Sequence, residues 1–342
     1  MPHPMILFTC ATLLPLPLIG LGAVLGGAWI GAALLFLTLI TATLDHLITR
    51  ATPASAKTEF PAATALSVTL ALGHFVLLAL VIRALAGEGL GLLEKAGLFA
   101  AAGLFFGQVS NSNAHELIHR SGRLLHGFGV WVYVSLLFGH HASAHTLVHH
   151  RLVATRADPS SARLGESFYR FARRAWKGSF RQGLAIESER LARLGRPRWQ
   201  HPYVTYVGGA ALLLALSAIL AGPLGLLAHL GLATFAQTQL LMSDYVQHYG
   251  LNRTTGPDGR PEPVGARHSW NSPHPASSVL MLNAPRHSDH HARPARAFPA
   301  LTLSDAAPML PRSLPVMACL ALWPRQWRRV MDPRAARWRN VA

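Results

Sequence analysis

Cysteine is scarce in this sequence. Only Cys10 and Cys319 occur among 342 residues, whereas an iron–sulfur centre needs four thiolates. A Gly-x-Gly-x-x-Gly pattern following a predicted strand, which would indicate a bound dinucleotide, is also absent. The chain therefore has neither a thiolate cluster nor a dinucleotide domain with which to store or relay electrons.

Acidic residues are also few. The sequence has 15 Asp and Glu against 31 Lys and Arg, which gives a formal net charge of +16. Most of the basic residues fall between residues 112 and 202 and between residues 250 and 342. The sequence contains no recognised nucleic-acid-binding module, and membrane topology and anionic lipid headgroups account for basic residues beside membrane spans. We therefore expect no nucleic-acid partner.

Long apolar runs fill much of the remaining sequence, and 51% of all residues are hydrophobic. Runs of about 20 apolar residues are typical of transmembrane helices. The expected spans are residues 5–24, 27–44, 61–85, 92–113, 204–221 and 224–247. We predict an all-α integral membrane protein with six transmembrane helices, which forms a single domain over residues 1–342.

The basic residues also predict the orientation, because cytoplasmic loops carry an excess of Lys and Arg. Both termini and the long segments 114–203 and 248–342 are expected in the cytoplasm. The segment 121–138 is too short, and too polar at its start, to cross the membrane. It predicts a helix that lies at the interface or dips partway into the membrane. Residues 168–195 predict amphipathic helices that either lie on the membrane surface or are solvated.

Histidine is abundant, with 19 residues. Nine of them fall into groups on the expected cytoplasmic side, in the motifs HELIH, HTLVHH, QHYG and APRHSDHH. The nine are His115, His119, His145, His149, His150, His248, His287, His290 and His291. His115 and His119 are four residues apart, so one helix face carries both. All nine lie near membrane depth and can converge on one site.

These histidines predict a metal site. Neutral imidazole is a common metal ligand, and many nitrogen donors with few carboxylates favour a transition metal over calcium or magnesium. Nine ligands exceed the four of a tetrahedral zinc site, so two metal ions are implied. HELIH alone fits a zinc protease with Glu116 as general base, but a protease does not require the additional histidines.

The other histidines are interpreted differently. His3, His46, His74, His126, His201 and His229 are taken as ordinary polar residues. His140, His141, His268 and His274 lie close enough to the groups to be outer partners of the ligands.

Several motifs together resemble a known family. HELIHR, HTLVHHRLVATRADPSSARLGES, DYVQHYGL, HSWNSPH and RHSDHHARP resemble, in order and spacing, the histidine boxes of the integral-membrane alkane hydroxylases. These enzymes are a branch of the fatty-acid desaturase and hydroxylase superfamily. The resemblance runs from about Asn113 to Asp332. It implies six transmembrane helices around a substrate channel, capped by a cytoplasmic di-iron site whose ligands match the nine histidines.

The resemblance also implies an activity and a partner. It implies terminal hydroxylation of alkanes with molecular oxygen, with electrons from rubredoxin and its reductase. It further matches Asp158, His268, Trp270, Asn271 and Asp289 to family positions. The sequence departs from the family at Ala144, Asp244, Gln247 and Ala284–Pro285.

An alkane offers no acidic proton and no polarised carbonyl, so hydroxylating it needs an oxidising metal centre rather than acid–base catalysis. Carboxylates that accept the remaining imidazole N–H bonds would orient the ligands. The candidates are Glu116, Asp158, Asp244 and Asp289. Asp244 has the strongest case, because an acid at the end of a span is costly unless it is paired.

The substrate and the electron donor are expected from different sides. An alkane would enter from the bilayer, and Trp29 is either the floor of its channel or an interface anchor. Without thiolate clusters, the chain needs a protein donor, rubredoxin or a ferredoxin-type reductase. An acidic donor would be attracted to the arginines of the cytoplasmic face, namely Arg120, Arg151, Arg156, Arg325, Arg328 and Arg329.

Alternatives remain open at this point. QHYG also resembles the xylene-type methyl hydroxylases, and a fatty acyl desaturase or hydroxylase could use the same scaffold. A metal transporter is disfavoured, because transport sites lie at mid-membrane between broken helices, whereas these histidines lie beyond span ends. The expected location is a bacterial-type inner membrane.

Overall fold

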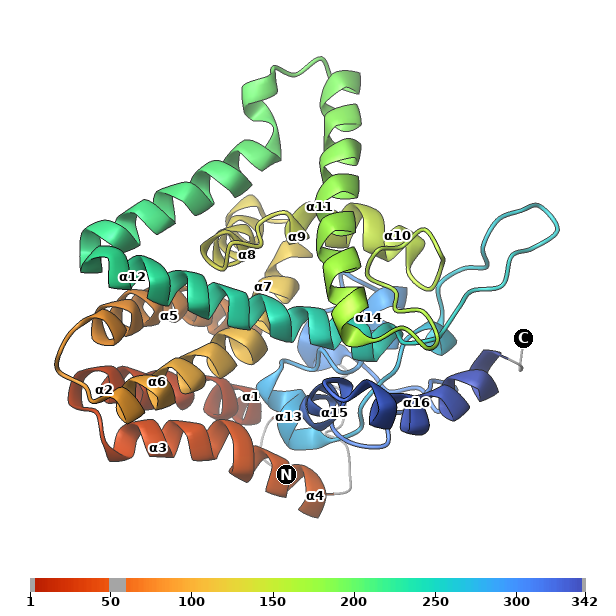
Figure 1. Cartoon of the computed structure of the whole chain (residues 1–342). Helices are drawn as coiled ribbons and strands as arrows, with labels where there is room; N and C mark the ends of the chain where they lie inside the picture. The colour runs from red at the N-terminus through yellow and green to blue at the C-terminus, as the bar shows by residue number, and fades with distance from the viewer. Residues whose placement is uncertain (1–3, 49–59, 340–342) are drawn as a thin grey trace.

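The computed structural model describes residues 4–48 and 60–339. Within these ranges the chain is helical, with no β-strand and two isolated β-bridges, Thr255 with Pro261 and Asn271 with Met309. The predicted all-α fold is confirmed. Figure 1 shows that the apolar helices lie side by side, while the polar connections gather at one end of them.

The first part of the chain forms the apolar helices. Its elements are α1 (Pro4–Leu13), α2 (Pro15–Leu25), α3 (Ala28–Leu35), η1 (Phe36–Ile40), α4 (Thr41–Leu47), α5 (Pro61–Ala86), α6 (Leu92–Phe105), η2 (Phe106–Ser110), α7 (Asn111–Ile118) and α8 (Arg123–Ser135). Here η1 and η2 are π-helical turns that interrupt longer helices. Helices and π-turns thus join into continuous rods.

The remaining elements build the polar end and the last apolar helices. They are α9 (His141–Ser143), η3 (Ala144–His149), α10 (His150–Leu152), α11 (Phe168–Arg193), η4 (Arg198–Gln200), α12 (Pro202–His248), η5 (Ala266–His268), α13 (Pro275–Leu280), α14 (His287–Ala292), η6 (Phe298–Ala300), α15 (Leu314–Ala321) and α16 (Pro324–Arg339). Of these, η3 is a π-helical turn, and η4, η5 and η6 are 3₁₀ turns.

Five helical stretches within the described residues are long and apolar enough to cross a membrane. They are Met5–Leu25, Ala28–Leu47, Pro61–Ala86, Leu92–Ile118 and Pro202–His248. Their number and composition indicate a multi-pass membrane protein.

The last stretch contains a break. Ala221 and Gly222 have non-helical backbone angles, with φ of +64° at Gly222, and Pro223 follows. Glycine adopts a positive φ without steric cost, and proline cannot continue the preceding helix. The second half of α12 consequently turns back from the first, and the two halves form a V (Figure 1). The break falls between the predicted spans 204–221 and 224–247, and six crossings remain a prediction.

Helix α8 is the segment expected at the interface or partway into the membrane. It packs against α5, α7 and α12. Its last turn, Val132 to Ser135, is fully buried. This placement fits a helix that dips among the spans.

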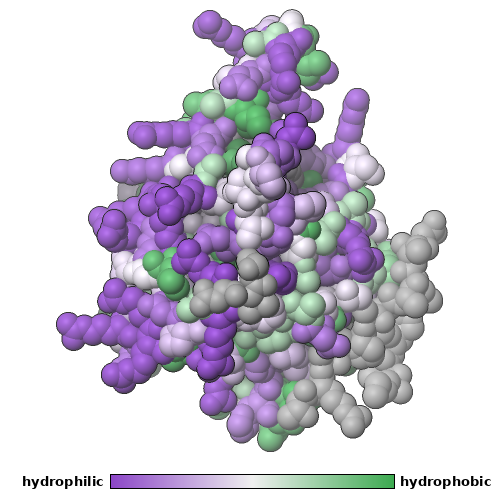
Figure 2. Space-filling view, turned by 90° about the vertical axis from the view of Figure 1, so that its right-hand side faces the viewer, coloured by the Kyte–Doolittle hydropathy of each residue, from purple (hydrophilic) through white to green (hydrophobic). Residues whose placement is uncertain are grey.

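Helix α11 runs across the direction of α12's second half (Figure 1). Phe171, Ala175, Ser179 and Gly183 recur every four residues and are buried, so one helix face packs on the protein. That face contacts η3 and α12. Figure 2 looks onto the polar end of the molecule, which is predominantly hydrophilic.

Candidate metal centre

The first histidine pair lies at the polar end of α7. His115 is in the last turn of α7, and His119 is the residue that ends the helix. Their ring centroids are 5.3 Å apart, as expected for two residues four apart on a helix. Both residues are half-buried, as is His150.

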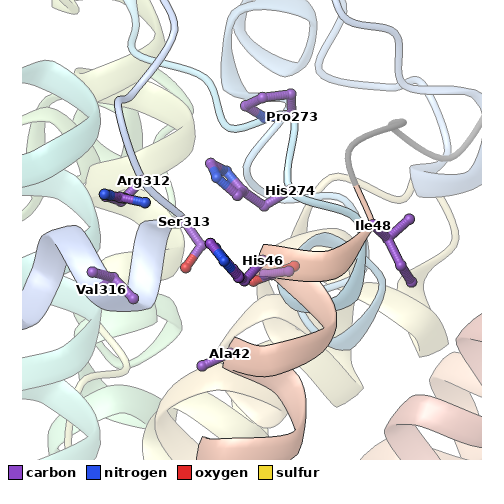
Figure 3. A pocket seen from close by; sticks show the side chains of 9 residues that line it. Ala42, His46, Ile48, Pro273, His274, Arg312, Ser313 and Val316 are labelled. Atoms are coloured by element: carbon purple, nitrogen blue, oxygen red, sulfur yellow. The ribbon is translucent and has the colours of Figure 1, made fainter.

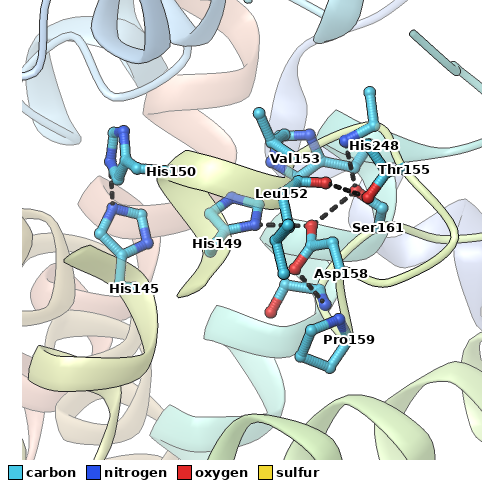
Figure 4. Close-up of polar contacts among 12 residues, drawn as sticks. His145, His149, His150, Leu152, Val153, Thr155, Asp158, Pro159, Ser161 and His248 are labelled. Atoms are coloured by element: carbon cyan, nitrogen blue, oxygen red, sulfur yellow. Dashed lines mark hydrogen bonds and ion pairs between the residues drawn. The ribbon is translucent and has the colours of Figure 1, made fainter. Parts of the chain in front are cut away.

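The second histidine group lies on η3. A π-turn is closed by i→i+5 hydrogen bonds, which brings residues four and five positions apart onto one side. His149 and His150 can both therefore approach the region of His145. The Nε2 atoms of His145 and His150 are 2.9 Å apart, and Figure 4 shows these two rings facing each other.

The remaining histidines come from the end of α12 and from the short helix α14. His248 Nε2 lies 3.0 Å from His287 Nε2, and His291 Nε2 lies 3.1 Å from the same atom. His290 points to the other side of α14, where its Nε2 is 3.1 Å from Nε2 of His150. One helical turn thus supplies nitrogen atoms to both sides.

The nine imidazoles form two adjacent groups. The half-buried group contains His115, His119, His145 and His290, and the buried group contains His149, His248, His287 and His291. Within each group the ligand nitrogens lie within 4.8 Å of one another. His150 adjoins the half-buried group through His145 and His290. The structure therefore brings together all nine predicted histidines.

This arrangement fits metal ions. Two nitrogens bound to one ion at about 2.0–2.1 Å and at right angles lie about 3 Å apart, which matches the spacings above. The Nε2 atoms of His119 and His149 are buried and have no hydrogen-bond partner among the described residues. A buried nitrogen without a partner is costly unless something binds it.

The electrostatics of the site favour free lone pairs. Burial, helped by neighbouring imidazoles, lowers the pKa of His287 to about 3 and that of His119 to about 4. It also lowers the pKa of His145, His150 and His291 well below the ordinary value. Neutral imidazole is the form that binds a metal.

His149 is the exception. Burial lowers its pKa. The charge and hydrogen bond of Asp158, helped by the charge of Asp244, raise the pKa by more than burial lowers it, so the net shift is upward. His149 Nδ1 lies 2.8 Å from Asp158 Oδ2, and Figure 4 shows this contact. The carboxylate also accepts from Ser160 N and from Ser161 Oγ. Asp158 therefore fixes the ring so that Nε2 faces the buried group.

Asn271 holds the start of α14. Its Oδ1 accepts from Ser288 N at 3.0 Å, and its Nδ2 donates to Ser288 Oγ at 2.7 Å. Trp270 is fully buried, and its indole N–H donates to the Tyr249 carbonyl. The HSWN element thus ties α14 to the end of α12, and so relates the last box to His248.

Two predicted carboxylate partners are wrong. Asp289 accepts from Arg296 Nη1 and from Thr302 N, both at 2.9 Å. Glu116 pairs with Arg120 one turn along. In a chain rich in arginine, guanidinium groups engage both carboxylates, and neither carboxylate is bonded to one of the nine histidines.

The side chains of three predicted histidine partners have other contacts, although the backbone of His268 hydrogen-bonds His248. His140 contacts Ser179 Oγ at 3.3 Å, and the His268 ring lies between Gly265 N and Glu262. His274 bonds to Ser272 Oγ at 2.9 Å. Trp29 is 40% exposed on α3, as the interface-anchor interpretation requires, and it lines none of the cavities described here.

Asp244 lies beside the histidines. It is 7% exposed, hydrogen-bonds Ser160, and lines a cavity of about 50 Å³. The lining of the same cavity includes His115, His145 and His287 together with apolar groups such as Leu240 and Met281. An apolar molecule of small cross-section could therefore reach the imidazoles here.

Residues 95–320 match the family model described as Fatty acid desaturase. This match covers more than half of the chain. The chain belongs to the fatty acid desaturase family.

Within that family, the relatives are monooxygenases by name. Alkane 1-monooxygenase 2 of Pseudomonas aeruginosa is 35% identical over 240 residues, 70% of this chain and 64% of its own length. Alkane 1-monooxygenase 1 of Alcanivorax borkumensis is 35% identical over 257 residues, 73% of this chain and 62% of its own. The xylene/toluene monooxygenase hydroxylase component XylM of Pseudomonas putida is 30% identical over 245 residues, 69% of this chain and 63% of its own length. The chain thus spans less than two thirds of the length of these relatives.

One departure from the alkane hydroxylase pattern has a structural explanation in this family member. Gln247 Nε2 donates to the Ala284 carbonyl at 3.2 Å, while its Oε1 accepts from Ser243 Oγ at 2.8 Å. A glutamate carboxylate could not make the first of these bonds. Gln247 and Ala284 both depart from the alkane hydroxylase pattern, and the hydrogen bond joins these two residues.

Sequence reasoning missed Arg174. Its Nη1 and Nη2 donate to the carbonyls of Pro159 and Ser161 at 2.9 and 3.0 Å. Its Nε and Nη2 also hold both oxygens of Glu166. Arg174 thereby fixes the loop that carries Asp158. The only signal for this role was a glutamate and an arginine eight positions apart, which is uninformative by itself.

Proposed function

We propose that this chain is a non-haem di-iron monooxygenase that hydroxylates the terminal carbon of medium-chain alkanes. The observation that carries the proposal is the pair of adjacent imidazole groups beside a cavity with an apolar wall. The names of several relatives support the activity. Bound iron would supply the oxidation chemistry with molecular oxygen, which no side chain of this protein can provide.

The residues of the chain have distinct roles in this proposal. The nine histidines hold the two irons, and Asp158 orients His149. Leu240 and Met281, in the wall of the cavity, direct the alkyl end toward His115 and His287. The burial of the whole buried group, and of His145 and His290 in the half-buried group, keeps water away from the reacting carbon.

Electrons must come from a protein donor, which we take to be rubredoxin or a ferredoxin-type protein with its reductase. On the polar face, Arg151, Arg156, Arg325, Arg328 and Arg329 are exposed. A hollow of about 390 Å³ is lined by Arg156, Arg163 and Arg339. Such a surface complements an acidic partner. Arg120, also predicted to take part, is already paired with Glu116.

The site also bears on topology. We infer six crossings of the inner membrane, with both termini and the histidine groups in the cytoplasm and with the chain acting as one domain. The basic residues of the polar end support this orientation.

A second candidate function is methyl hydroxylation of alkyl-aromatic compounds, which the 30% identity to the XylM component favours. Fatty acyl oxidation on the same scaffold is a third outcome. Membranes that contain the chain, rubredoxin and its reductase should be incubated with octane, xylene or a fatty acid, and the products identified. We expect octan-1-ol that depends on oxygen and reductant. Exclusive oxidation of xylene or the fatty acid would reject the alkane assignment.

A further inference from the structure

Two cavities adjoin each other between α4, the start of α15 and the residues that precede α13. One has a volume of about 470 Å³ and a mixed lining of polar and apolar groups, with His46, His274 and Arg312 among the polar ones. The other has a volume of about 440 Å³ and is mainly apolar. Ala42, Asp45, Ser313 and Val316 line both. We call them the polar cavity and the apolar cavity.

The apolar cavity lies between two π-turns. Leu37, Thr38 and Leu39 come from η1, and Gln108 comes from η2. The Oε1 atom of Gln108 is buried and has no hydrogen-bond partner among the described residues. The preceding residue of η2, Gly107, lines the small cavity beside His115. The π-turn η2 therefore separates the apolar cavity from the metal centre.

The apolar cavity opens toward the outer surface of the helices. Leu39 is 61% exposed and Val316 is 43% exposed. Leu39 belongs to a stretch that is apolar enough to cross a membrane. A molecule in this cavity would thus be in contact with the lipid phase on that side.

The polar cavity lies at the end of the same stretch. Figure 3 shows the rings of His46 and His274 close to Ser313, with Arg312 and Val316 on the other side of the space. His274 uses its Nδ1 for Ser272 Oγ, which leaves Nε2 available. Asp45 accepts from Ser277 N through Oδ1, and its Oδ2 is without a partner among the described residues. The lining thus offers both donors and acceptors.

We propose that the two cavities form one site for a long-chain primary alcohol, with the hydroxyl in the polar cavity and the alkyl chain in the apolar cavity. This inference rests on the proposed function, because such an alcohol is the product of terminal alkane hydroxylation. An alkane has no group that the polar cavity could recognise. A hydroxyl that leaves the metal centre needs hydrogen-bond partners, because an unpaired one is costly in an apolar medium.

The lining also distinguishes between polar heads. A hydroxyl group donates one hydrogen bond and accepts others, so it is served by the mixture of Asp45, imidazoles and Arg312. A carboxylate head can only accept: it can pair with Arg312, but it is repelled by Asp45 and cannot donate to the unpartnered Asp45 Oδ2 atom. The site is therefore assigned to the alcohol rather than to a fatty acid, and it serves the release of product to the membrane interface.

The chain provides its own reporter for this site. Cys319 lines the apolar cavity and is exposed, while Cys10 is exposed on α1 and lines neither cavity. The rate at which N-ethylmaleimide alkylates each cysteine should be measured in the full-length protein, with and without dodecanol. We expect dodecanol to slow alkylation of Cys319 and to leave Cys10 unchanged.

Variants of the polar cavity test the role of the hydroxyl. In His274→Phe, the dodecanol concentration that half-protects Cys319 should rise about fivefold, the equivalent of one lost hydrogen bond. Protection by dodecane, which has no hydroxyl, should not change. Ser313→Ala gives a second, milder test if His274→Phe folds poorly. His201→Phe, a histidine outside both cavities, is the matched control and should behave as wild type.

Three outcomes would overturn the proposal: equal protection of Cys10 and Cys319, protection by dodecanoate stronger than by dodecanol, or an unchanged dodecanol response in both variants. Alkylation requires no turnover, so it is independent of the hydroxylation assay. Protection of Cys319 in a protein that yields no octanol would reject the proposed function alone. Octanol formation without protection would reject this site alone.

Discussion

His149 and Asp158 form a buried pair, with Nδ1 and Oδ2 2.8 Å apart and both side chains nearly inaccessible to solvent. Asp158 has its other contacts with Ser160 and Ser161, so the carboxylate cannot rotate away without losing them. The carboxylate accepts a hydrogen from Nδ1, which leaves the Nε2 lone pair for the buried group. A loop residue thereby sets which nitrogen of His149 faces the centre.

Replacing Asp158 should weaken metal binding. Loss of a carboxylate that orients a ligand histidine typically costs about 10–100-fold in metal affinity or activity. We expect Asp158→Ala to lose iron during purification, while Asp158→Asn, which retains a hydrogen-bonding group, loses less. Iron per chain, measured by elemental analysis, checks this.

Asp289→Asn is the matched control. Its carboxylate contacts Arg296 and Thr302 rather than an imidazole, although it lies within the last histidine box. We expect wild-type iron content in this variant. Equal iron loss in Asp158→Ala and Asp289→Asn would contradict a specific role for Asp158.

The two histidine groups should respond separately to substitution. His290 belongs to the half-buried group and His248 to the buried group. Because each ion would depend on its own group, His290→Ala and His248→Ala should each lose mainly one of the two irons, and hydroxylation should fall below detection in both. His201→Ala is the control, since that ring contacts Ser188 Oγ and Tyr203 N outside both groups. A fully active His290→Ala would remove the basis of the proposed function.

Docking of the electron donor should depend on charge. Arg325, Arg328 and Arg329 are exposed on α16. Replacing all three by Gln should raise KM for rubredoxin about tenfold, about 1.4 kcal/mol, and leave kcat unchanged. Raising ionic strength should increase the wild-type KM and narrow the difference in KM between wild type and the triple variant, because salt screens exposed charges. Arg260→Gln, on an exposed loop, is the control. A wild-type KM that ignores salt would argue against this surface.

The sequence predicted the apolar helices and the convergence of the nine histidines, because both depend on local patterns. Apolar runs have a length set by the bilayer, and four-residue spacing places His115 with His119 and His287 with His291 on one face. The π-turn η3 left no such pattern. Which carboxylate meets an imidazole could not be predicted either, because Asp158 and Asp289 look alike in sequence. Arg296 and Arg174, brought in by the fold, decide between them.

The sequence predicts that His74 and His229, which lie within the apolar helices, are ordinary polar residues. In the structure both contact the end of α8. His229 Nε2 donates to the Ser135 carbonyl at 2.6 Å, since a carbonyl can only accept. Ser135 Oγ donates to Val132 O, so His74 Nε2 donates to Ser135 Oγ at 2.8 Å. Both rings thereby hold the last residue of α8, which packs on α7 and its histidines.

Replacing His74 should loosen this end of α8. His74→Leu removes the His74 contact of Ser110 Oγ and one of the two contacts of Ser135 Oγ, which still donates to the Val132 carbonyl. A buried polar group that loses its partner costs about 1–3 kcal/mol. We expect a lower Tm in detergent and reduced iron content, with partial recovery in His74→Gln. His46→Leu, at an exposed position, should match wild type. An unchanged Tm in His74→Leu would show that the contact is dispensable.

The last prediction concerns the contact between α8 and the helix that carries the first histidine pair. A Cβ atom on Gly129 would lie 2.8 Å from the Ala114 carbonyl oxygen and 2.9 Å from Leu117 Cβ. The backbone of α7 cannot yield without moving His115. Gly127, on the same helix, has nothing within 4 Å of such a Cβ. Since alanine favours a helix over glycine by about 1 kcal/mol, Gly127→Ala should be neutral or stabilising. Gly129→Ala should lower both Tm and iron content. If the two variants behave alike, close packing of α8 does not position the metal centre.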